Sequence, residues 1–452
     1  MNTTRKLCAL GPVAQRKTKI VCTIGPETES FAMLSKMYSA GMNIARLNMS
    51  HGDHKWHKKV IENIKDLNKK VKYPVAILLD TQGPEIRTGD IQNELDLKTG
   101  MEISVTVRDE LDVEETSIHI HYEDLIHSVK SGDKITVDNG LINLEIIEKH
   151  ERTLSCRVID GGMLKSKRHV NLPGIRVNLP GLARKDKEDI LFGISLGVDF
   201  IALSFVRDAK DVLELKKLLG TKAGKIRVIS KIENQEGVTN LEEIIKESDG
   251  IMVARGDLGV EIDLEELPNV QRKIARLCAE YGKRSIVATH LLESMIENPI
   301  PTRAEVTDVA NAVYEEVDAV MLSGETTVGK YPLKCIEQLV NISLTAEMFP
   351  GLNFSQNLRK ETDKQHLNHH AVRLAEELDV RAIIVFTRRG IMADFISNCR
   401  PSKPVVYAFT NVSQTRRCMM LNRGIYPYMI TFSSDPEKTI QKAFKILISR
   451  EG

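Results

Sequence analysis

The chain has 452 residues, 42% of them hydrophobic, which is enough for about three domains with large buried cores. This composition excludes a disordered or fibrous protein. The 63 basic and 62 acidic residues leave a net charge of +1, and only 5% of residues are aromatic, so the composition gives no support to nucleic-acid binding.

Cysteine usage and hydropathy indicate a cytoplasmic protein. The seven cysteines are scattered and form no C-x-x-C pair, which fits a reducing compartment better than a disulfide framework or a zinc site. The longest apolar run, residues 191–206, is interrupted by Asp199 and is too short to span a membrane. The N-terminal segment, residues 1–15, lacks the long apolar core of a secretory signal. We therefore expect neither a membrane nor a nucleic-acid partner.

Short runs rich in β-branched residues alternate with amphipathic helical segments along most of the chain. The runs lack strict alternation of polar and apolar residues, which is typical of parallel strands buried on both faces. Eight such strands joined by helical crossovers predict a closed (β/α)8 barrel of the TIM type. The predicted strands are residues 18–24, 42–48, 75–80, 199–205, 226–232, 249–254, 285–289 and 318–323, and the clearest helices are 30–41, 53–71 and 268–282.

The barrel pattern is interrupted after the third strand. Residues 88–180 show alternating patterns and the turn signals 138–140 and 160–162, which predict a small inserted β-barrel domain. Residues 16–87 and 181–350 together then have a length near the roughly 250 residues of a (β/α)8 barrel.

The remainder, residues 351–452, predicts a third domain of the α/β class. It begins with a polar segment, 353–366, expected to be a linker, and then alternates helices and strands.

In a (β/α)8 barrel, the chemistry lies at the carboxyl ends of the strands, where the loops converge on one face. Lys231 and Glu233 are two residues apart, so an extended strand points both side chains to the same side. The polar side chains at the predicted strand ends are Arg46, Asn48, Ser50, Asp80, Thr81, Arg87, Lys231, Glu233, Arg255, Asp257, Thr289, Ser323 and Glu325.

The residue types at these ends favour a metal-assisted reaction of a phosphate. Glu233 and Asp257 are oxygen ligands suited to Mg²⁺ or Mn²⁺. Cations such as Arg46, Lys231 and Arg87 neutralise the charge of a transferring phosphoryl group. A second cluster, with one carboxylate and neutral oxygens, suits a weaker-binding cation; it comprises Asn48, Ser50, Asp80 and Thr81. The chain has no Walker loop and no G-x-G-x-x-G motif.

Several linked segments resemble the pyruvate kinase family. They include KIVCTIGP (19–26), MNIARLNMSHG (42–52), LLDTQGPEIRTG (78–89), ISKIENQEG (229–237), IMVARGDLGVE (251–261), VATHLLESM (287–295) and the segment 301–326. The resemblance covers nearly the whole chain. It implies transfer of a phosphoryl group from phosphoenolpyruvate to ADP, a homotetramer, and a lid formed by the inserted domain that excludes water from the site.

The resemblance also implies a role for each matching residue. Lys231 would face the transferring phosphoryl group, Glu233 and Asp257 would hold Mg²⁺, and the potassium ligands would be Asn48, Ser50, Asp80 and Thr81. Phosphoenolpyruvate would bind at Arg46, Lys231, Gly256, Asp257 and Thr289, and the nucleotide at Asn48, Ser50, His51, Arg87 and Lys185. The residues expected in catalysis are Arg46, Arg87, Lys231, Thr289 and Ser323.

Some positions refine or depart from this resemblance. Family members that need potassium carry glutamate at the position of Glu85, so we expect activation by K⁺. His290 stands where the family usually has glutamine. The loop 387–393 lacks the hydroxyls that hold an effector phosphate in the family, which weakens the expectation of activation by fructose 1,6-bisphosphate. The chain stops after a predicted helix at 436–452, where the family continues with two strands, so we expect either a shortened third domain or a sheet edge that a neighbouring subunit covers.

The sequence leaves two alternatives open. A related barrel could handle pyruvate enolate by Mg²⁺-dependent aldol chemistry, but such an enzyme needs neither the potassium cluster nor the lid. An inactive relative could serve as a regulatory partner, although Lys231, Glu233 and Asp257 are all present.

Overall fold

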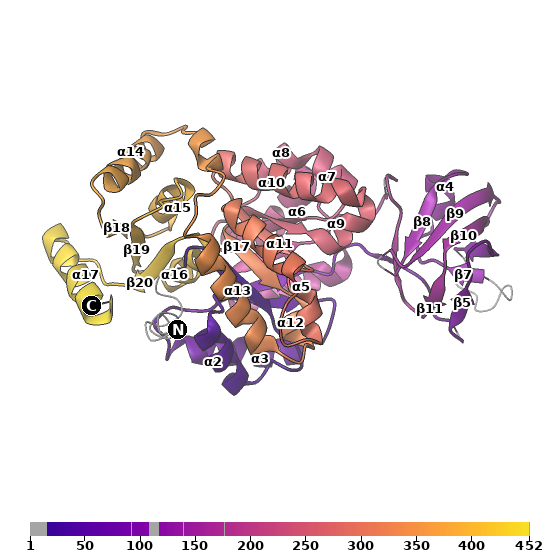
Figure 1. The fold of residues 1–452 in the computed structure, drawn as a ribbon, viewed down its shortest axis with the longest axis horizontal. Helices are drawn as coiled ribbons and strands as arrows, with labels where there is room; N and C mark the ends of the chain where they lie inside the picture. Colours follow the sequence, from indigo (N-terminus) through magenta and orange to yellow (C-terminus); the bar gives the residue numbers. More distant parts are fainter. Residues whose placement is uncertain (1–15, 92, 108–116, 139, 176, 452) are drawn as a thin grey trace.

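The computed structural model describes residues 16–451 except 92, 108–116, 139 and 176 (Figure 1). The predicted N-terminal segment 1–15 and Asn139 of the predicted turn therefore lie outside the described residues. Among the described residues, no helix combines the length and the apolar character needed to cross a bilayer.

The central domain is a closed barrel of eight parallel strands, which confirms the predicted (β/α)8 fold. Every residue of β1, β3, β15 and β16 is buried, which explains why the predicted strands lack a polar face. The strands in barrel order are β1 (Lys19–Thr23), β17 (Ala319–Leu322), β16 (Arg284–Ala288), β15 (Gly250–Ala254), β14 (Arg227–Ile232), β13 (Phe200–Leu203), β3 (Ala76–Asp80) and β2 (Ile44–Asn48).

Helices surround this barrel, and local capping signals fix their ends. The side chain of Ser30 accepts a hydrogen bond from the backbone N–H of Met33 at the start of α2, and Gly41 ends that helix with a φ of +129°. The barrel helices are α2 (Phe31–Ala40), α3 (His54–Asn68), α5 (Arg184–Leu196), α6 (Ala209–Leu219), α7 (Gln235–Thr239), α8 (Leu241–Glu247), α9 (Arg255–Glu261), α10 (Leu267–Tyr281), α11 (Arg303–Tyr314), α12 (Gly324–Thr327) and α13 (Pro332–Ala346). Single turns of 3₁₀ helix lie at η1 (Gly220–Lys222), η2 (Leu264–Glu266) and η3 (Glu293–Ile296).

The insertion after β3 forms its own sheet, which projects from the barrel at the right of Figure 1. An antiparallel bridge between Thr88 and Ile120 joins the two edges of this seven-stranded sheet, so the sheet returns on itself as a small barrel. We call this inserted domain the lid. Its seven-stranded sheet has the order β4 (Ile86–Arg87), β12 (His169–Asn171), β8 (Lys134–Val137), β9 (Ile142–Lys149), β10 (Thr153–Asp160), β6 (Glu102–Thr106) and β7 (Ser117–His119); β5 (Leu95–Leu97) pairs with β11 (Gly162–Leu164), and α4 is Leu125–Ser128.

The C-terminal region is an α/β domain with a parallel three-stranded sheet, as predicted. The expected linker 353–366 is wrong in part, because α14 already begins at Asp363. A capping box formed by Thr362 and Gln365 starts this helix within the polar segment. The elements are η4 (Phe354–Asn357), α14 (Asp363–Glu377), β18 (Ala382–Phe386), α15 (Ile391–Asn398), β19 (Val405–Thr410), α16 (Ser413–Cys418), η5 (Met419–Leu421), β20 (Ile425–Met429) and α17 (Pro436–Glu451).

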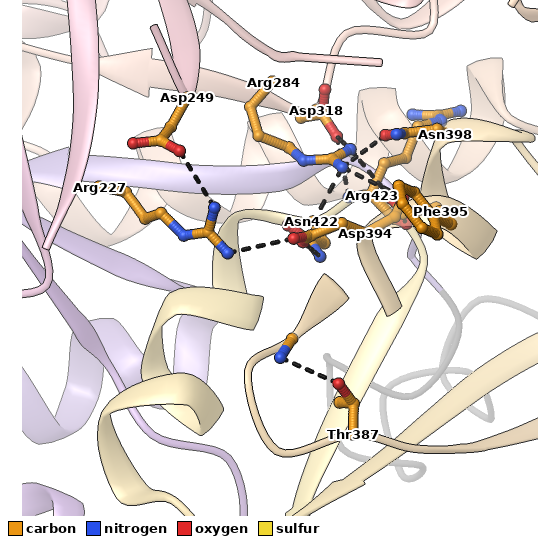
Figure 2. A network of polar contacts seen from close by, with 12 residues as sticks. Arg227, Asp249, Arg284, Asp318, Thr387, Asp394, Phe395, Asn398, Asn422 and Arg423 are labelled. Atoms are coloured by element: carbon orange, nitrogen blue, oxygen red, sulfur yellow. Dashed lines mark hydrogen bonds and ion pairs between the residues drawn. The ribbon is translucent and has the colours of Figure 1, made fainter. Parts of the chain in front are cut away.

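This C-terminal domain contacts the first residues of β1, β14 and β16, namely Lys19, Arg227 and Arg284, so it covers the amino ends of the barrel strands. It lies on the side of the barrel opposite to the lid (Figure 1). Met252 and Met321 inside the barrel belong to the same buried hydrophobic cluster as Phe409 and Tyr426 of the C-terminal sheet. A polar layer surrounds this contact, in which Arg227 joins the barrel to the C-terminal domain (Figure 2). The carboxyl ends of the strands are therefore left for the lid.

Candidate active site

Four charged side chains meet at the carboxyl ends of β2, β3 and β14. Lys231 Nζ lies 3.2 Å from Asp80 Oδ1 and 2.9 Å from Glu233 Oε1. Arg46 Nε donates to Asp80 Oδ2 at 2.6 Å, and its Nη1 donates to Thr23 at 2.9 Å. The predicted common side of Lys231 and Glu233 is confirmed by this contact. The barrel thus gathers residues that are up to about 200 positions apart in the sequence.

Ser204 completes this cluster and is not among the residues predicted from the sequence. Lys231 Nζ donates to Ser204 Oγ at 2.7 Å, and Ser204 Oγ in turn donates to the carbonyl of Thr81 at 2.7 Å. Thr23, which holds Arg46, was missed as well. Both residues are the polar residues at or just after the carboxyl end of a barrel strand, and this position was the available signal.

The cluster is buried, and its charged groups shift one another's pKa values. Burial lowers the pKa of Lys231, but the adjacent carboxylates of Asp80 and Glu233 outweigh this effect and raise the pKa above its ordinary value. Burial raises the pKa of Asp80, but the positive charges of Lys231 and Arg46 prevail and lower it. Lys231 is therefore a fixed ammonium ion that is 8% exposed at the barrel mouth.

Glu233 and Asp257 form a pair of carboxylates with an excess of negative charge. Burial raises the pKa of Glu233, and the charge of Asp257 raises it further, whereas Lys231 opposes both effects. Within the described ranges Asp257 has no ion pair, and no group of three or more His, Cys, Asp or Glu side chains is placed to hold a metal. Two carboxylates fit Mg²⁺, which is commonly bound by one or two carboxylates together with substrate oxygens and water.

Gly256 and Thr289 are held together beside this pair. The backbone N–H of Gly256 donates to Thr289 Oγ1 at 2.7 Å, and Arg255 Nη2 donates to the Thr289 carbonyl at 2.7 Å. Thr289 has a φ of +68°, which is strained for a β-branched residue. Such strain persists only where the surrounding structure enforces it, and it is commonly found at functional sites.

The predicted monovalent-cation residues lie at the ends of β2 and β3. Asn48 is paired in register with Asp80, and Asn48 Oδ1 accepts a hydrogen bond from the backbone N–H of Ser50 at 3.1 Å. Thr81 Oγ1 accepts a hydrogen bond from the backbone N–H of Ser204 at 3.1 Å. The structure brings these four predicted residues to adjacent strand ends, with Asp80 engaged by Arg46 and Lys231.

Comparisons with known proteins agree with this geometry. Sequence models of the pyruvate kinase barrel domain and of the pyruvate kinase alpha/beta domain match residues 15–336 and 365–451. The chain is 46% identical over 440 residues to pyruvate kinase isozyme G, chloroplastic, from Nicotiana tabacum, covering 96% of this chain and 78% of that protein. It is 41% identical to pyruvate kinase from Clostridium perfringens, covering 95% of this chain and 92% of that protein. The chain belongs to the pyruvate kinase family.

The fold supports the same assignment. A crystal structure of a pyruvate kinase from Cryptosporidium parvum superposes with a TM-score of 0.92 at 36% identity, covering 97% of this chain and 92% of that one. Members of the pyruvate kinase family are phosphotransferases, so the chain belongs to an enzyme family.

The residues predicted to bind nucleotide occupy two places around the barrel mouth. Lys185 Nζ lies on α5, 2.5 Å from the carbonyl of Met49 and 2.8 Å from Asp189. His51 is exposed and follows the same turn after β2. Arg87 lies on β4 of the lid, where its Nε donates to Glu85 at 2.7 Å. Arg87 is therefore the member of this set that belongs to the lid sheet.

Two further predicted residues lie after β16 and β17. Ser323 follows β17, and its Oγ is buried without a hydrogen-bond partner in the described part of the chain, so a bound molecule could satisfy it. His290, at the position of the usual family glutamine, is largely exposed and lies 3.7 Å from Glu293. The His290 ring also faces Gly256.

Proposed function

We propose that this protein transfers the phosphoryl group of phosphoenolpyruvate to ADP and thereby forms pyruvate and ATP. Family membership supports the reaction, and the observation that carries the proposal is the buried Lys231 ammonium held by Asp80, Glu233 and Ser204 at the barrel mouth. A fixed cation in a buried site of low dielectric constant stabilises the charge that develops on a transferring phosphoryl group.

In the proposed reaction, a β-phosphate oxygen of ADP attacks the phosphorus of phosphoenolpyruvate. The bond from phosphorus to the enol oxygen breaks, and its electron pair stays on that oxygen. Arg46 and Lys231 neutralise the phosphoryl group during transfer, and both side chains are already oriented by Asp80. The enolate then takes a proton at carbon 3 on the side of Thr289, which gives pyruvate.

Glu233 and Asp257 are the proposed ligands of Mg²⁺ or Mn²⁺, because they are an incompletely neutralised pair of carboxylates beside Lys231. When bound, this cation supplies positive charge to the phosphate and carboxylate oxygens of the substrate. Asn48, Ser50, Asp80 and Thr81 are the proposed ligands of K⁺, and Glu85 is the basis for expecting dependence on it.

Phosphoenolpyruvate would bind at Arg46, Lys231, Gly256, Asp257 and Thr289, with the buried hydroxyl of Ser323 nearby. In this proposal the nucleotide lies along a path formed by Asn48, Ser50, His51, Arg87 and Lys185. Because Arg87 belongs to the lid sheet, closing the lid would bring its guanidinium to the nucleotide and exclude water.

We also propose a homotetramer in the cytoplasm. The tetramer rests on the family alone and is tested by light scattering of the purified protein. The six cysteines within the described residues are free, which is consistent with a reducing compartment. Relatives include both a protein named as chloroplastic and bacterial proteins, so cell fractionation is the test of location.

The test of the activity is to incubate the purified protein with phosphoenolpyruvate, ADP, Mg²⁺ and K⁺ and to measure pyruvate and ATP separately. Equal amounts of both products are expected. Neither an aldolase-like barrel nor an inactive relative, the two alternatives that the sequence leaves open, would form ATP. Absence of both products under these conditions would contradict the proposal.

A further inference from the structure

One of the places where the lid contacts the barrel is a short helix, α9. At the end of β12, Asn171 Nδ2 donates to Glu261 Oε1 at 2.7 Å, and Glu261 is the last residue of α9. A methyl group placed on Gly140, in the lid turn after β8, would lie 3.8 Å from Val260 of the same helix. Two parts of the lid that are distant in sequence therefore meet the same end of α9.

The other end of α9 carries residues of the candidate active site. The helix has seven residues and begins at Arg255, so Gly256 and Asp257 lie about 10 Å or less from Glu261. Arg255 is fixed by Asp308 at 2.7 Å and by the carbonyl of Thr289. A helix this short transmits a displacement of one end to the other, because its backbone hydrogen bonds resist local bending.

The Asn171–Glu261 hydrogen bond is the polar contact that joins the lid sheet to the helix carrying Asp257. Asn171 is only 4% exposed, and burial raises the pKa of Glu261, with the charge of Asp257 adding to this effect and the hydrogen bond from Asn171 opposing it. Beside it lies a cavity of about 220 Å³, lined by Leu172 and Val177 of the lid connection and by Arg207 of the barrel, which donates hydrogen bonds to the carbonyls of Val177 and Leu179. The connection is thus held on both sides of this cavity, by Asn171 on α9 and by Arg207.

A second contact links the lid to the other carboxylate. The ring of His169 on β12 lies 5.8 Å from the ring of Phe205, centroid to centroid. The backbone N–H of Phe205 donates to Glu233 Oε2 at 2.7 Å, and Phe205 has a φ of +53°. Strand β12 therefore contacts, through α9 and through Phe205, the two elements that place Asp257 and Glu233.

We propose that Asn171 and Glu261 are positioning residues that couple the docking of the lid to the placement of Gly256 and Asp257. Neither touches the reacting atoms. When the hydrogen bond is made, α9 is held in the position that presents Asp257 beside Glu233. When it is broken, the lid loses its hydrogen bond to the helix that carries Gly256 and Asp257. The catalytic meaning of this coupling rests on the proposed phosphoryl transfer.

The experiment compares Glu261→Ala, Glu261→Gln, Asn171→Ala and the double variant Asn171→Ala/Glu261→Ala with the wild type. Glu265→Ala is the matched control, because Glu265 is an exposed carboxylate in η2 just after α9. The measurements are kcat, the KM for each substrate, and the binding of Mn²⁺ to the substrate-free protein by electron paramagnetic resonance. Thermal melting is recorded first to show that each variant is folded.

Both alanine variants are expected to lower kcat/KM about tenfold and to weaken Mn²⁺ binding several-fold. Glu261→Gln keeps an acceptor oxygen and should recover most of both losses. The double variant should be no worse than the more affected single variant, because both substitutions remove the same contact. Glu265→Ala should behave as wild type.

Wild-type Mn²⁺ binding and turnover in Glu261→Ala or Asn171→Ala would overturn the coupling. So would additive losses in the double variant, or a glutamine variant as impaired as the alanine variant. If one of the two alanine variants does not fold, the other tests the coupling, because it removes the same hydrogen bond from the opposite side. A wild-type protein that binds Mn²⁺ with the expected differences between variants but forms no pyruvate would contradict the proposed reaction and leave the coupling supported.

Discussion

The two ends of the barrel both carry buried charges, and they differ in how far neighbouring cations neutralise the buried carboxylates. At the amino ends, Asp318 accepts hydrogen bonds from Arg400, Arg284 and two backbone N–H groups. Arg227 lies between Asp249 and Asp394, and Arg284 also donates to Asn398, as Figure 2 shows. The C-terminal domain covers this layer.

At the carboxyl ends the neutralisation of the carboxylates is incomplete, because Asp257 has no ion pair within the described ranges. Each end also has a buried polar atom without a hydrogen-bond partner among the described residues, Ser323 Oγ at this end and Arg400 Nε at the other. The pKa shifts follow this difference: burial raises the pKa of both Glu233 and Asp318, but the arginines around Asp318 reverse the shift, whereas Glu233 keeps a raised pKa. Buried charged residues therefore stabilise the fold at the amino ends of the strands, whereas at the carboxyl ends they remain able to bind charged ligands.

The largest effect on turnover is expected from Lys231→Met, at the carboxyl ends of the barrel strands. Removing the ammonium should lower kcat by about three orders of magnitude or more, because the developing phosphoryl charge loses its fixed cation. The variant should still fold, but its melting temperature should fall, because the buried carboxylates of Asp80 and Glu233 lose their shared cation. Steady-state kinetics and thermal melting are the measurements. Activity close to wild type would remove Lys231 from the proposed role.

Asp318→Asn tests the opposite end. It should lower the free energy of unfolding by about 3–5 kcal/mol, because Arg400 and Arg284 would remain buried without their shared carboxylate. Denaturant unfolding at pH 7 measures this loss. The kcat of the folded fraction should stay near that of wild type. Unchanged stability together with lost turnover would contradict the claim that Asp318 stabilises the fold and takes no part in catalysis.

The contribution of Asp318 to the free energy of unfolding should also depend on pH, and it should decrease in acid. Burial raises its pKa, but the positive charges of Arg400 and Arg284 prevail, so the folded-state pKa lies below the unfolded value of about 3.9. The stabilisation is then fully present above about pH 4 and is lost as pH falls further. The difference in unfolding free energy between wild type and Asp318→Asn should therefore be constant near neutrality and narrow in acid. A difference that widens as the pH falls would contradict this sign.

A smaller effect is expected from the monovalent cation. Exchanging K⁺ for Na⁺ should lower turnover about tenfold, the equivalent of about 1.4 kcal/mol, because the oxygens at the ends of β2 and β3 would lose their preferred ion. The matched variant is Glu85→Lys, which places a fixed positive charge four residues after Thr81 and should reduce the dependence of the rate on K⁺. Equal wild-type rates in the two salts would refute the prediction.

The smallest expected effect is at His290. Its side chain is exposed and lies 3.7 Å from Glu293, outside the buried cluster around Lys231. His290→Gln, which restores the usual family residue, should change kcat less than about threefold, as is usual for a surface substitution. Initial rates at saturating substrate measure it. A loss of tenfold or more would place His290 in the protonation step.

The sequence by itself determined the barrel strands and the placement of Lys231 beside Glu233. Both follow from local rules: buried parallel strands read as continuous β-branched runs, and residues two apart on a strand share a side. The start of α14 at Asp363 was also readable, from the Thr362 and Gln365 capping box, but the polar composition of the segment hid it.

Which residues, distant in the sequence, form hydrogen bonds with one another depends on the tertiary structure and could not be predicted. The bridge between Thr88 and Ile120 that closes the lid, the contact of Lys231 with Ser204, and the bond from Asn171 to Glu261 join residues from 27 to 90 positions apart. A buried polar group must find a partner, but the sequence does not state where that partner is. That choice depends on which strand ends the folded barrel brings together and on which of them a second domain covers.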